Sequence, residues 1–200
     1  MGEKQVFQPL TKEDKVTVIL YRIGIVLSAI MIAGLAFLLW AASTASGRTG
    51  SMPADILLYG LQASVGMCVF FIHLYIGKFK RFLKNLYFVS LACLAALLFI
   101  GNGSLSGALV QVPSSALLLL PLSGCLGFVT AKEAFCFQLF EGYLLAIIMP
   151  FCLVLAASGV LDGPRASSGM ALIAAMLVFF TLRKAFMPLA YDIGDKSAYH

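Results

Sequence analysis

The chain has 200 residues, of which 61% are hydrophobic and 12% are charged, against about 25% charged residues in ordinary soluble domains. A soluble fold of this size leaves much of its surface in water and cannot bury so much apolar side chain. The mean hydropathy of +0.98 therefore excludes an ordinary soluble domain and predicts one membrane-embedded domain. The net charge of +5 comes from basic residues at the ends of apolar runs, so nucleic acid is not expected as a partner.

Six apolar runs approach the roughly 20 residues that an α-helix needs to cross hydrocarbon. We expect an all-α fold, a polytopic membrane helix bundle with about six transmembrane helices. The connections contain helix breakers, such as GNGSLSG at 101–107. The spanning domain is expected over 16–187, between polar tails at 1–15 and 188–200. The expected spans are Val16–Ala42, Ala54–Gly77, Leu83–Gly101, Gly107–Val129, Phe137–Leu161 and Ser168–Met187.

The distribution of Lys and Arg predicts the orientation, because cytoplasmic loops carry an excess of both. With six spans, one side holds both tails, the second-to-third connection and the fourth-to-fifth turn, with twelve basic residues, and the other holds two, Arg48 and Arg165. Five or seven spans would scramble this segregation. Both termini are therefore expected on the cytoplasmic or equivalent side. Arg22, inside the first run, is expected to snorkel to that side.

The second expected span carries a polar face. Its residues, at alternating spacings of four and three, are Asp55, Tyr59, Gln62, Gly66, Val69 and His73. At about 100° per residue they fall within a sector of roughly 80°, which should turn into the bundle because lipid is a poor host for polar side chains. The face has two interpretations. It is a proton or solute path, or it forms hydrogen bonds between helices with Asp55 and His73 at the two interfaces.

Three prolines predict irregular helices on either side of the fourth-to-fifth turn. Pro113 fits the first turn of the fourth span, where the missing N–H costs little. Pro121 is expected to kink that span, and Pro150 to free a carbonyl in the middle of the fifth. Such breaks indicate either a binding site between broken helices or ordinary packing kinks.

The stretch Gly124–Gly142 has the densest polar chemistry in the apolar part of the chain. Its charged residues are Lys132, Glu133 and Glu141, and Cys136 follows Lys132 by one turn. We expect Lys132 and Glu133 where the fifth span enters the membrane, and Glu141 about two turns deeper on the same helix face as Glu133. An unpaired carboxylate there would cost on the order of several kcal/mol or take up a proton. The expected partners of Glu141 are His73, Lys132, Arg22 or Lys84.

These residues belong to a longer segment that resembles a known family. The segment GFVTAKEAFCFQLFEGYLLA (Gly127–Ala146), with P-x-S-G-C-x-G (Pro121–Gly127) before it, resembles a family of uncharacterised integral membrane proteins of cyanobacteria and plastids. The resemblance implies multi-pass residence in a membrane, and it supplies no catalytic residue. The positions that carry it are Lys132, Glu133, Phe135, Cys136 and Glu141.

Cofactor and metal chemistry has little support in the sequence. The five cysteines lie in or beside apolar runs without a C-x-x-C pair, and free Cys in such surroundings packs as a small apolar residue. His73 is the only histidine besides His200, so the clusters of His that membrane metal sites use are missing. We therefore expect no cofactor and no metal site. The sequence also lacks the G-x-S-x-G, H-E-x-x-H and P-loop motifs.

Three functions remain open. The first is a non-enzymatic membrane scaffold or assembly partner, which would use small residues to pack against partner helices. The small residues in question are Ala29, Ala33, Gly60 and Ser64, provided that they face lipid. The second is a small proton-coupled transporter that uses the polar face of the second span and Glu141.

The third is an intramembrane enzyme, which would depend on the clustering of Lys132, Glu133, Cys136 and Glu141. The expected partners are the lipid bilayer and either other membrane proteins or a second copy of the chain. The expected location is a bacterial inner membrane, or a thylakoid or plastid membrane if the resemblance holds.

Overall fold

The computed structural model describes residues 11–44, 51–74, 77–161, 163–188 and 192. The elements in these ranges are α1 (Lys12–Thr44), α2 (Ser51–Phe71), α3 (Gly77–Ile100), α4 (Leu105–Gln111), the 3-10 helix η1 (Pro113–Leu119), α5 (Leu120–Phe137), α6 (Phe140–Ala157) and α7 (Gly163–Ala185). Six helical segments are long and apolar enough to cross a membrane, the fourth being η1 and α5 together. The prediction of an all-helical bundle with six spans is confirmed for the described residues.

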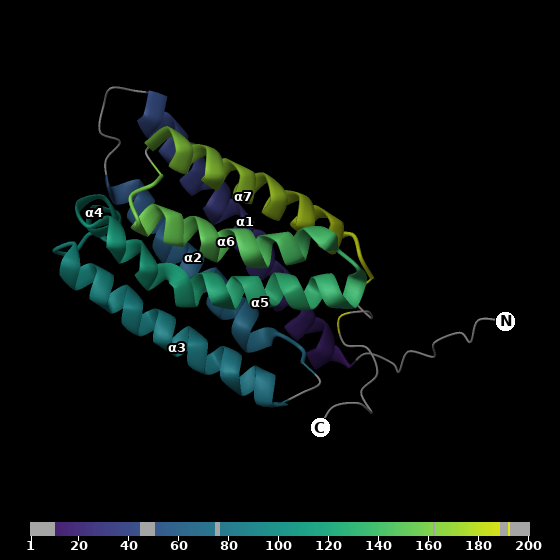
Figure 1. The fold of residues 1–200 in the computed structure, drawn as a ribbon. Helices are drawn as coiled ribbons and strands as arrows, with labels where there is room; N and C mark the ends of the chain where they lie inside the picture. Colours follow the sequence, from purple (N-terminus) through teal and green to yellow (C-terminus); the bar gives the residue numbers. More distant parts are fainter. Residues whose placement is uncertain (1–10, 45–50, 75–76, 162, 189–191, 193–200) are drawn as a thin grey trace.

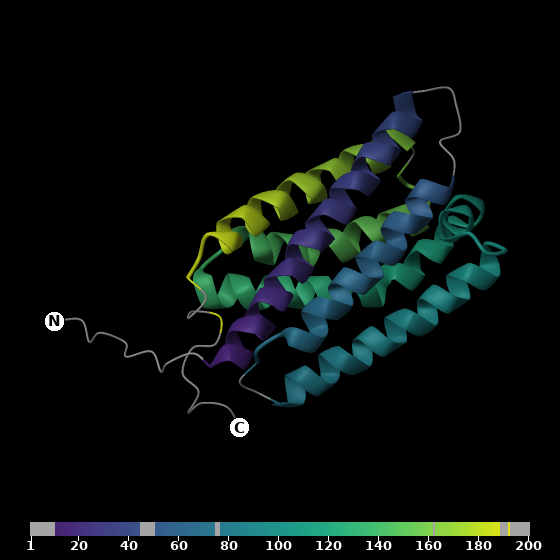
Figure 2. The same ribbon diagram turned by 180° about the vertical axis from the view of Figure 1, so that it is seen from behind.

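The long helices form two layers (Figures 1 and 2). In one layer α1 lies between α2 and α7, and in the other α5 lies between α6 and α3. The layers meet where α6 packs on α7 and where α2 packs on α5 and α3. Large aliphatic side chains fill the space between them, among them Ile25, Leu126, Leu145 and Leu177. The outer faces of α3 and α6 remain rich in exposed apolar side chains, as expected of helices in contact with lipid.

The fourth span differs from its predicted range at both ends. The chain forms the separate short helix α4 before Pro113, and Ser104 caps that helix by accepting a hydrogen bond from the Gly107 N–H at 3.0 Å. Pro113 begins η1 as predicted, but Pro121 lies in the first turn of α5 and does not kink a continuous helix. Because the chain offers neither Gly nor Pro between 129 and 137, α5 continues to Phe137. Pro150 lies inside α6, as predicted.

Small residues allow α1 and α2 to cross closely. A Cβ atom on Gly24 would lie 2.8 Å from Cys68 Sγ and 2.9 Å from the carbonyl oxygen of Ser64. The hydroxyls of Ser28 and Ser64 share a hydrogen bond of 2.8 Å in the same crossing. Ser64 and Ala29 are buried, and Gly60 packs against Met31. These three do not face lipid, so they cannot serve the partner contacts considered above.

One end of the bundle collects the positive charge. The starts of α1, α3 and α6 and the ends of α2, α5 and α7 lie at this end (Figure 1), which we call the basic end. It contains all described Lys and Arg residues except Arg165: Lys12, Lys15, Arg22, Lys78, Lys80, Arg81, Lys84, Lys132, Arg183 and Lys184. The segregation expected for six spans is therefore present in the fold. Which side of the membrane the basic end faces stays a prediction.

Candidate functional site

The turn between α5 and α6 corrects the expected position of the charged stretch. Gln138 adopts a left-handed conformation with φ of 54° and ends α5, and the N–H groups of Gln138 and Leu139 both bond the carbonyl of Ala134. Lys132 and Glu133 therefore lie in the last turns of the fourth span, and not at the entry of the fifth. The prediction that Glu133 and Glu141 share one helix face is wrong, because a helix break separates them.

Glu133 is the centre of a polar cluster from three helices. Its side chain is 0% exposed. The Tyr21 hydroxyl on α1 donates to Oε1 at 2.7 Å, and Lys132 Nζ donates to the same oxygen at 2.8 Å. Lys184 on α7 forms an ion pair with Oε2. A carboxylate at this depth is stable only with such partners, since an unpaired buried charge costs far more than a paired one.

Asp192 extends this cluster beyond the end of α7. Its carboxylate forms an ion pair with Lys184 and accepts from Nε and Nη2 of Arg22 at 2.7 and 2.6 Å. Arg22 also donates to the carbonyls of Met187 and Pro188, at 2.6 and 3.0 Å. The guanidinium thereby joins α1 to the chain that leaves α7. Arg22 does reach toward the basic end as expected, but it binds protein groups there.

Together these side chains form what we call the buried charge network: Arg22, Lys132, Glu133, Lys184 and Asp192. The network has one more positive than negative charge, and each of its members has an ion-pair partner within it. The aromatic ring of Phe137 adds a cation–π contact, with Lys184 Nζ 3.7 Å from the ring centroid. Chemically, such an arrangement can hold helices together. It presents no activated nucleophile beside a free base.

Glu141 lies in the first turn of α6, with a partner that the sequence did not indicate. Arg183 Nη1 donates to its Oε1 at 2.7 Å, and the Arg183 side chain is 44% exposed. The expected partners His73, Lys132, Arg22 and Lys84 are therefore wrong for this carboxylate. A negative charge in the first turn of a helix is also stabilised by the free N–H groups there. Glu141 and Arg183 thus form a peripheral ion pair beside the buried charge network.

His73 lies just beyond the end of α2 and close to the network. Its Nε2 is 3.3 Å from Thr17 Oγ1, and its Nδ1 is buried without a hydrogen-bond partner. Burial, followed by the charges of Lys80 and Lys132, holds the pKa of His73 below its usual 6.5, while Asp14 and Asp192 act in the opposite direction. His73 is therefore a neutral imidazole at physiological pH with one unused ring nitrogen.

The polar face of α2 forms hydrogen bonds with its neighbours at two levels, those of Asp55 and Gln62. Asp55 accepts from Ser104 Oγ at 2.8 Å and from the Ser106 N–H at 2.7 Å, which fixes the start of α4. Deeper in the bundle, Gln62 Nε2 donates to Ser90 Oγ at 2.8 Å, and the Oε1 of Gln62 is buried without a partner. These contacts support the interpretation of hydrogen bonds between helices.

Sequence reasoning missed three members of this site: Tyr21, Lys184 and Asp192. The only available signal was that the charge segregation placed Arg183 and Lys184 at the same end as Lys132. Cys136, a candidate from the sequence, is exposed on α5. No group of three or more His, Cys, Asp or Glu in the described ranges is arranged to hold a metal ion.

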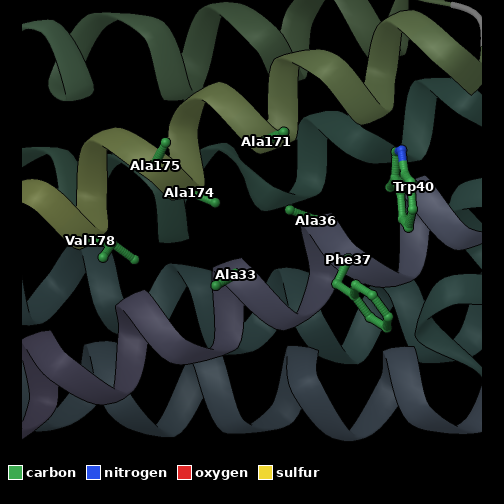
Figure 3. Close-up of a pocket in the computed structure, with 8 residues that line it drawn as sticks. All are labelled: Ala33, Ala36, Phe37, Trp40, Ala171, Ala174, Ala175 and Val178. Carbon is green, nitrogen blue, oxygen red and sulfur yellow. The ribbon is translucent and has the colours of Figure 1, made fainter.

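An apolar groove lies between α1 and α7 on the outside of the bundle. Figure 3 shows Ala171, Ala174 and Ala175 of α7 opposite Ala33 and Ala36 of α1. Phe37, Trp40 and Val178 complete the lining. Of the small residues considered for partner contacts, Ala33 lines this groove. Nothing in the lining could bind a polar substrate, apart from the indole N–H of Trp40.

Comparison with known proteins gives one match. The model of a family described as "Uncharacterized integral membrane protein (DUF2301)" matches residues 67–200. No curated protein and no solved structure matches. The matched range begins near the end of α2 and includes His73, Lys132, Glu133 and Lys184, whereas Tyr21 and Arg22 lie before it.

Proposed function

We propose a function from the premise that this chain belongs to that family of uncharacterised integral membrane proteins, whose model covers most of its length. The chain is a multi-pass membrane protein. We propose that its role is non-enzymatic and that it assembles in the membrane with a partner, either another membrane protein or a second copy of itself. The groove between α1 and α7 is the contact surface.

The groove carries this proposal because of its composition. Helices associate in lipid by close van der Waals packing, which small side chains permit. Ala171 and Ala175 are exposed one turn apart on α7, and Ala33 and Ala36 face them from α1. A partner helix in this groove would pack closely against the backbones of both α1 and α7. Exposed Phe37 and Trp40 would pack along its side.

The ion pairing of the charged side chains within the chain supports a non-enzymatic role. The buried charge network is paired within the chain, and Glu141 is held by Arg183. The enzyme alternative would require one of these groups to act on a substrate, and Cys136 lies on the outside of α5. For these reasons assembly ranks above catalysis.

The proposal places the protein in a bacterial inner membrane, or in a thylakoid or plastid membrane, with both termini and the basic end on the cytoplasmic or equivalent side. The asymmetry of Lys and Arg supports this orientation. Tags at each terminus and in 101–107, probed from each side of the membrane, would test it. A terminus that reports from the same side as 101–107 would overturn the topology.

The assembly function is tested by purification from native membrane in a mild detergent, followed by mass determination. We expect a stoichiometric partner or a homo-oligomer. The variant Ala171→Leu/Ala175→Leu should fill the groove and lose the partner. The matched control Ala63→Leu/Ala92→Leu changes two exposed alanines on α2 and α3 and should keep it. A wild-type chain that purifies as a monomer, or a groove variant that retains its partner, would refute the proposal.

A proton-coupled transporter is the second candidate, and the buried Nδ1 of His73, which has no hydrogen-bond partner, favours it. In that case His73 would exchange protons at the basic end, with the α2 face continuing the path. The test is pH-dependent flux in vesicles. His73→Ala and Glu141→Gln should each abolish it. Wild-type flux in His73→Ala would remove this candidate.

A further inference from the structure

The first two turns of α3 carry a concentration of positive charge without counter-charge. Lys78, Lys80, Arg81 and Lys84 lie within the sequence GKFKRFLK, and α3 contains no acidic residue. None of these four cations forms an ion pair with the described residues. We call these residues, with Phe79 and Phe82 between them, the α3 basic patch.

The helix geometry makes the charges of the α3 basic patch unfavourable to one another. Lys78 with Arg81, Lys80 with Lys84, and Arg81 with Lys84 are three or four residues apart, so like charges lie on neighbouring turns of one surface. The beginning of a helix is also its positive end, which disfavours cations in the first turn. An anion bound from outside would offset both effects.

The other described cations of the basic end each have an acidic partner or an acidic neighbour in the sequence. Arg22, Lys132 and Lys184 belong to the buried charge network, and Arg183 is paired with Glu141. In the first turn of α1, Lys12 and Lys15 flank Glu13 and Asp14, so this turn has no net charge. The largest group of cations without an acidic neighbour among the described residues is therefore the α3 basic patch.

The aromatic side chains of the α3 basic patch indicate what kind of anion it meets. Phe79 and Phe82 are 50% and 58% exposed, and they lie at the start of a membrane-spanning helix. Apolar rings beside Lys and Arg at this level lie at the boundary between headgroups and acyl chains. A soluble anion would use the cations and leave these rings in water, whereas a lipid satisfies both.

We propose that the α3 basic patch binds the headgroups of anionic membrane lipids, with Lys78 and Arg81 on the phosphate groups and Phe79 and Phe82 against the acyl chains. The fit is one of charge complementarity, since arrays of Lys and Arg beside a membrane span attract anionic lipids. This inference does not rest on the proposed assembly function.

His73 offers an independent readout of lipid binding. Lys80 is one of the charges that lower its pKa, together with Lys132 on α5, while Asp14 on α1 and Asp192 raise it. An anionic headgroup on the α3 basic patch would screen Lys80 and move the pKa of His73 upward. Zwitterionic lipid would leave it in place.

The test uses the full chain in lipid nanodiscs made of phosphatidylcholine with or without phosphatidylglycerol. Phosphatidylglycerol retention is measured by native mass spectrometry, and the His73 pKa by NMR. For Lys78→Gln/Arg81→Gln we expect phosphatidylglycerol affinity to fall roughly 20- to 30-fold, and the His73 pKa to lose its dependence on this lipid. The matched control Lys12→Gln/Lys15→Gln removes the same charge at the same end and should change affinity less than about threefold.

Equal losses in the two double variants would overturn the proposal, because binding would then follow net charge alone. Equal competition by glycerol phosphate would assign the patch to a soluble anion, and displacement of lipid by an RNA oligonucleotide would assign it to nucleic acid. Thermal unfolding of each variant is measured in phosphatidylcholine alone. If the α3 variant unfolds there at a lower temperature than wild type, Arg81→Lys, which keeps the charge, must restore both stability and lipid binding for the proposal to stand.

Discussion

Glu133→Gln is the substitution that most directly tests the buried charge network. It keeps the size of the side chain and an oxygen for the Tyr21 hydroxyl, and removes only the negative charge. Lys132 then loses its only ion-pair partner among the described residues, while Lys184 retains Asp192. The network passes from one excess positive charge to two, in a place from which water is excluded.

The expected loss of stability follows from this burial. Breaking a buried ion pair by removing one partner costs about 3–5 kcal/mol, because the other charge stays behind without compensation. The amide retains neutral hydrogen bonds, each contributing about 0.5–1.5 kcal/mol. We therefore expect Glu133→Gln to lower the free energy of unfolding by about 3 kcal/mol.

Reversible unfolding in mixed detergent micelles measures this difference, with Glu141→Gln as the matched control. Both carboxylates pair with a cation of α7, but the Arg183 side chain is 44% exposed, so Glu141→Gln leaves its cation in contact with solvent and should lose less than about 1 kcal/mol. Adding Lys132→Met to Glu133→Gln restores the original excess of one charge and should recover at least half of the loss. Similar losses in the two single variants, or a double variant less stable than Glu133→Gln, would refute the reasoning.

Three further outcomes follow from the same structure. Gly142→Ala should lower the free energy of unfolding by about 1–3 kcal/mol, because the new Cβ would clash with a backbone carbonyl of α5. The control Gly169→Ala, whose Cβ would have one contact at 3.7 Å, should be neutral in the same unfolding assay. Asp55→Ala should cost about 1–2 kcal/mol and speed amide exchange at Ser106, whose N–H it binds. The pKa of His73 lies below 6.5 in the folded chain, so the unfolded chain takes up the proton first as the pH falls. The free energy of unfolding should therefore be highest above pH 6.5 and decrease as the pH falls toward the pKa of His73 in the folded chain. His73→Asn should remove this pH dependence.

The spans were predictable because their signal is local. A run of about 20 apolar residues has few alternatives to crossing the membrane, and the alternation of connections rich and poor in Lys and Arg predicts the number of crossings. The fourth span was harder, because the segment 105–119 contains no charged residue, and only Ser104, Pro113 and Pro121 mark where α4, η1 and α5 begin. The left-handed Gln138 carries no glycine signal, so the expected helix ran through it.

The partners in the site were not predictable, because they depend on how helices far apart in the sequence are rotated against each other. Charge segregation places Lys132, Arg183 and Lys184 at one end of the bundle. It does not tell which of the two adjacent cations of α7 turns inward to Glu133 and which turns outward to Glu141. Asp192, from a segment expected to be a polar tail, carries no local mark of its burial.

Removing the charges of the buried charge network from water costs free energy, and this cost bears on what the network does. Helices in lipid gain little from hydrophobic association, so the choice of neighbour and of rotation must come from packing and polar contacts. A single carboxylate, Glu133, binds α1 through Tyr21 and α7 through Lys184, and the peripheral pair of Glu141 and Arg183 adds little to that choice. Apolar replacements could match the stability of such pairs, but they would accept many rotations of α7. A network that admits one rotation also fixes which alanines of α7 face outward, and it thereby shapes the groove that the assembly proposal requires.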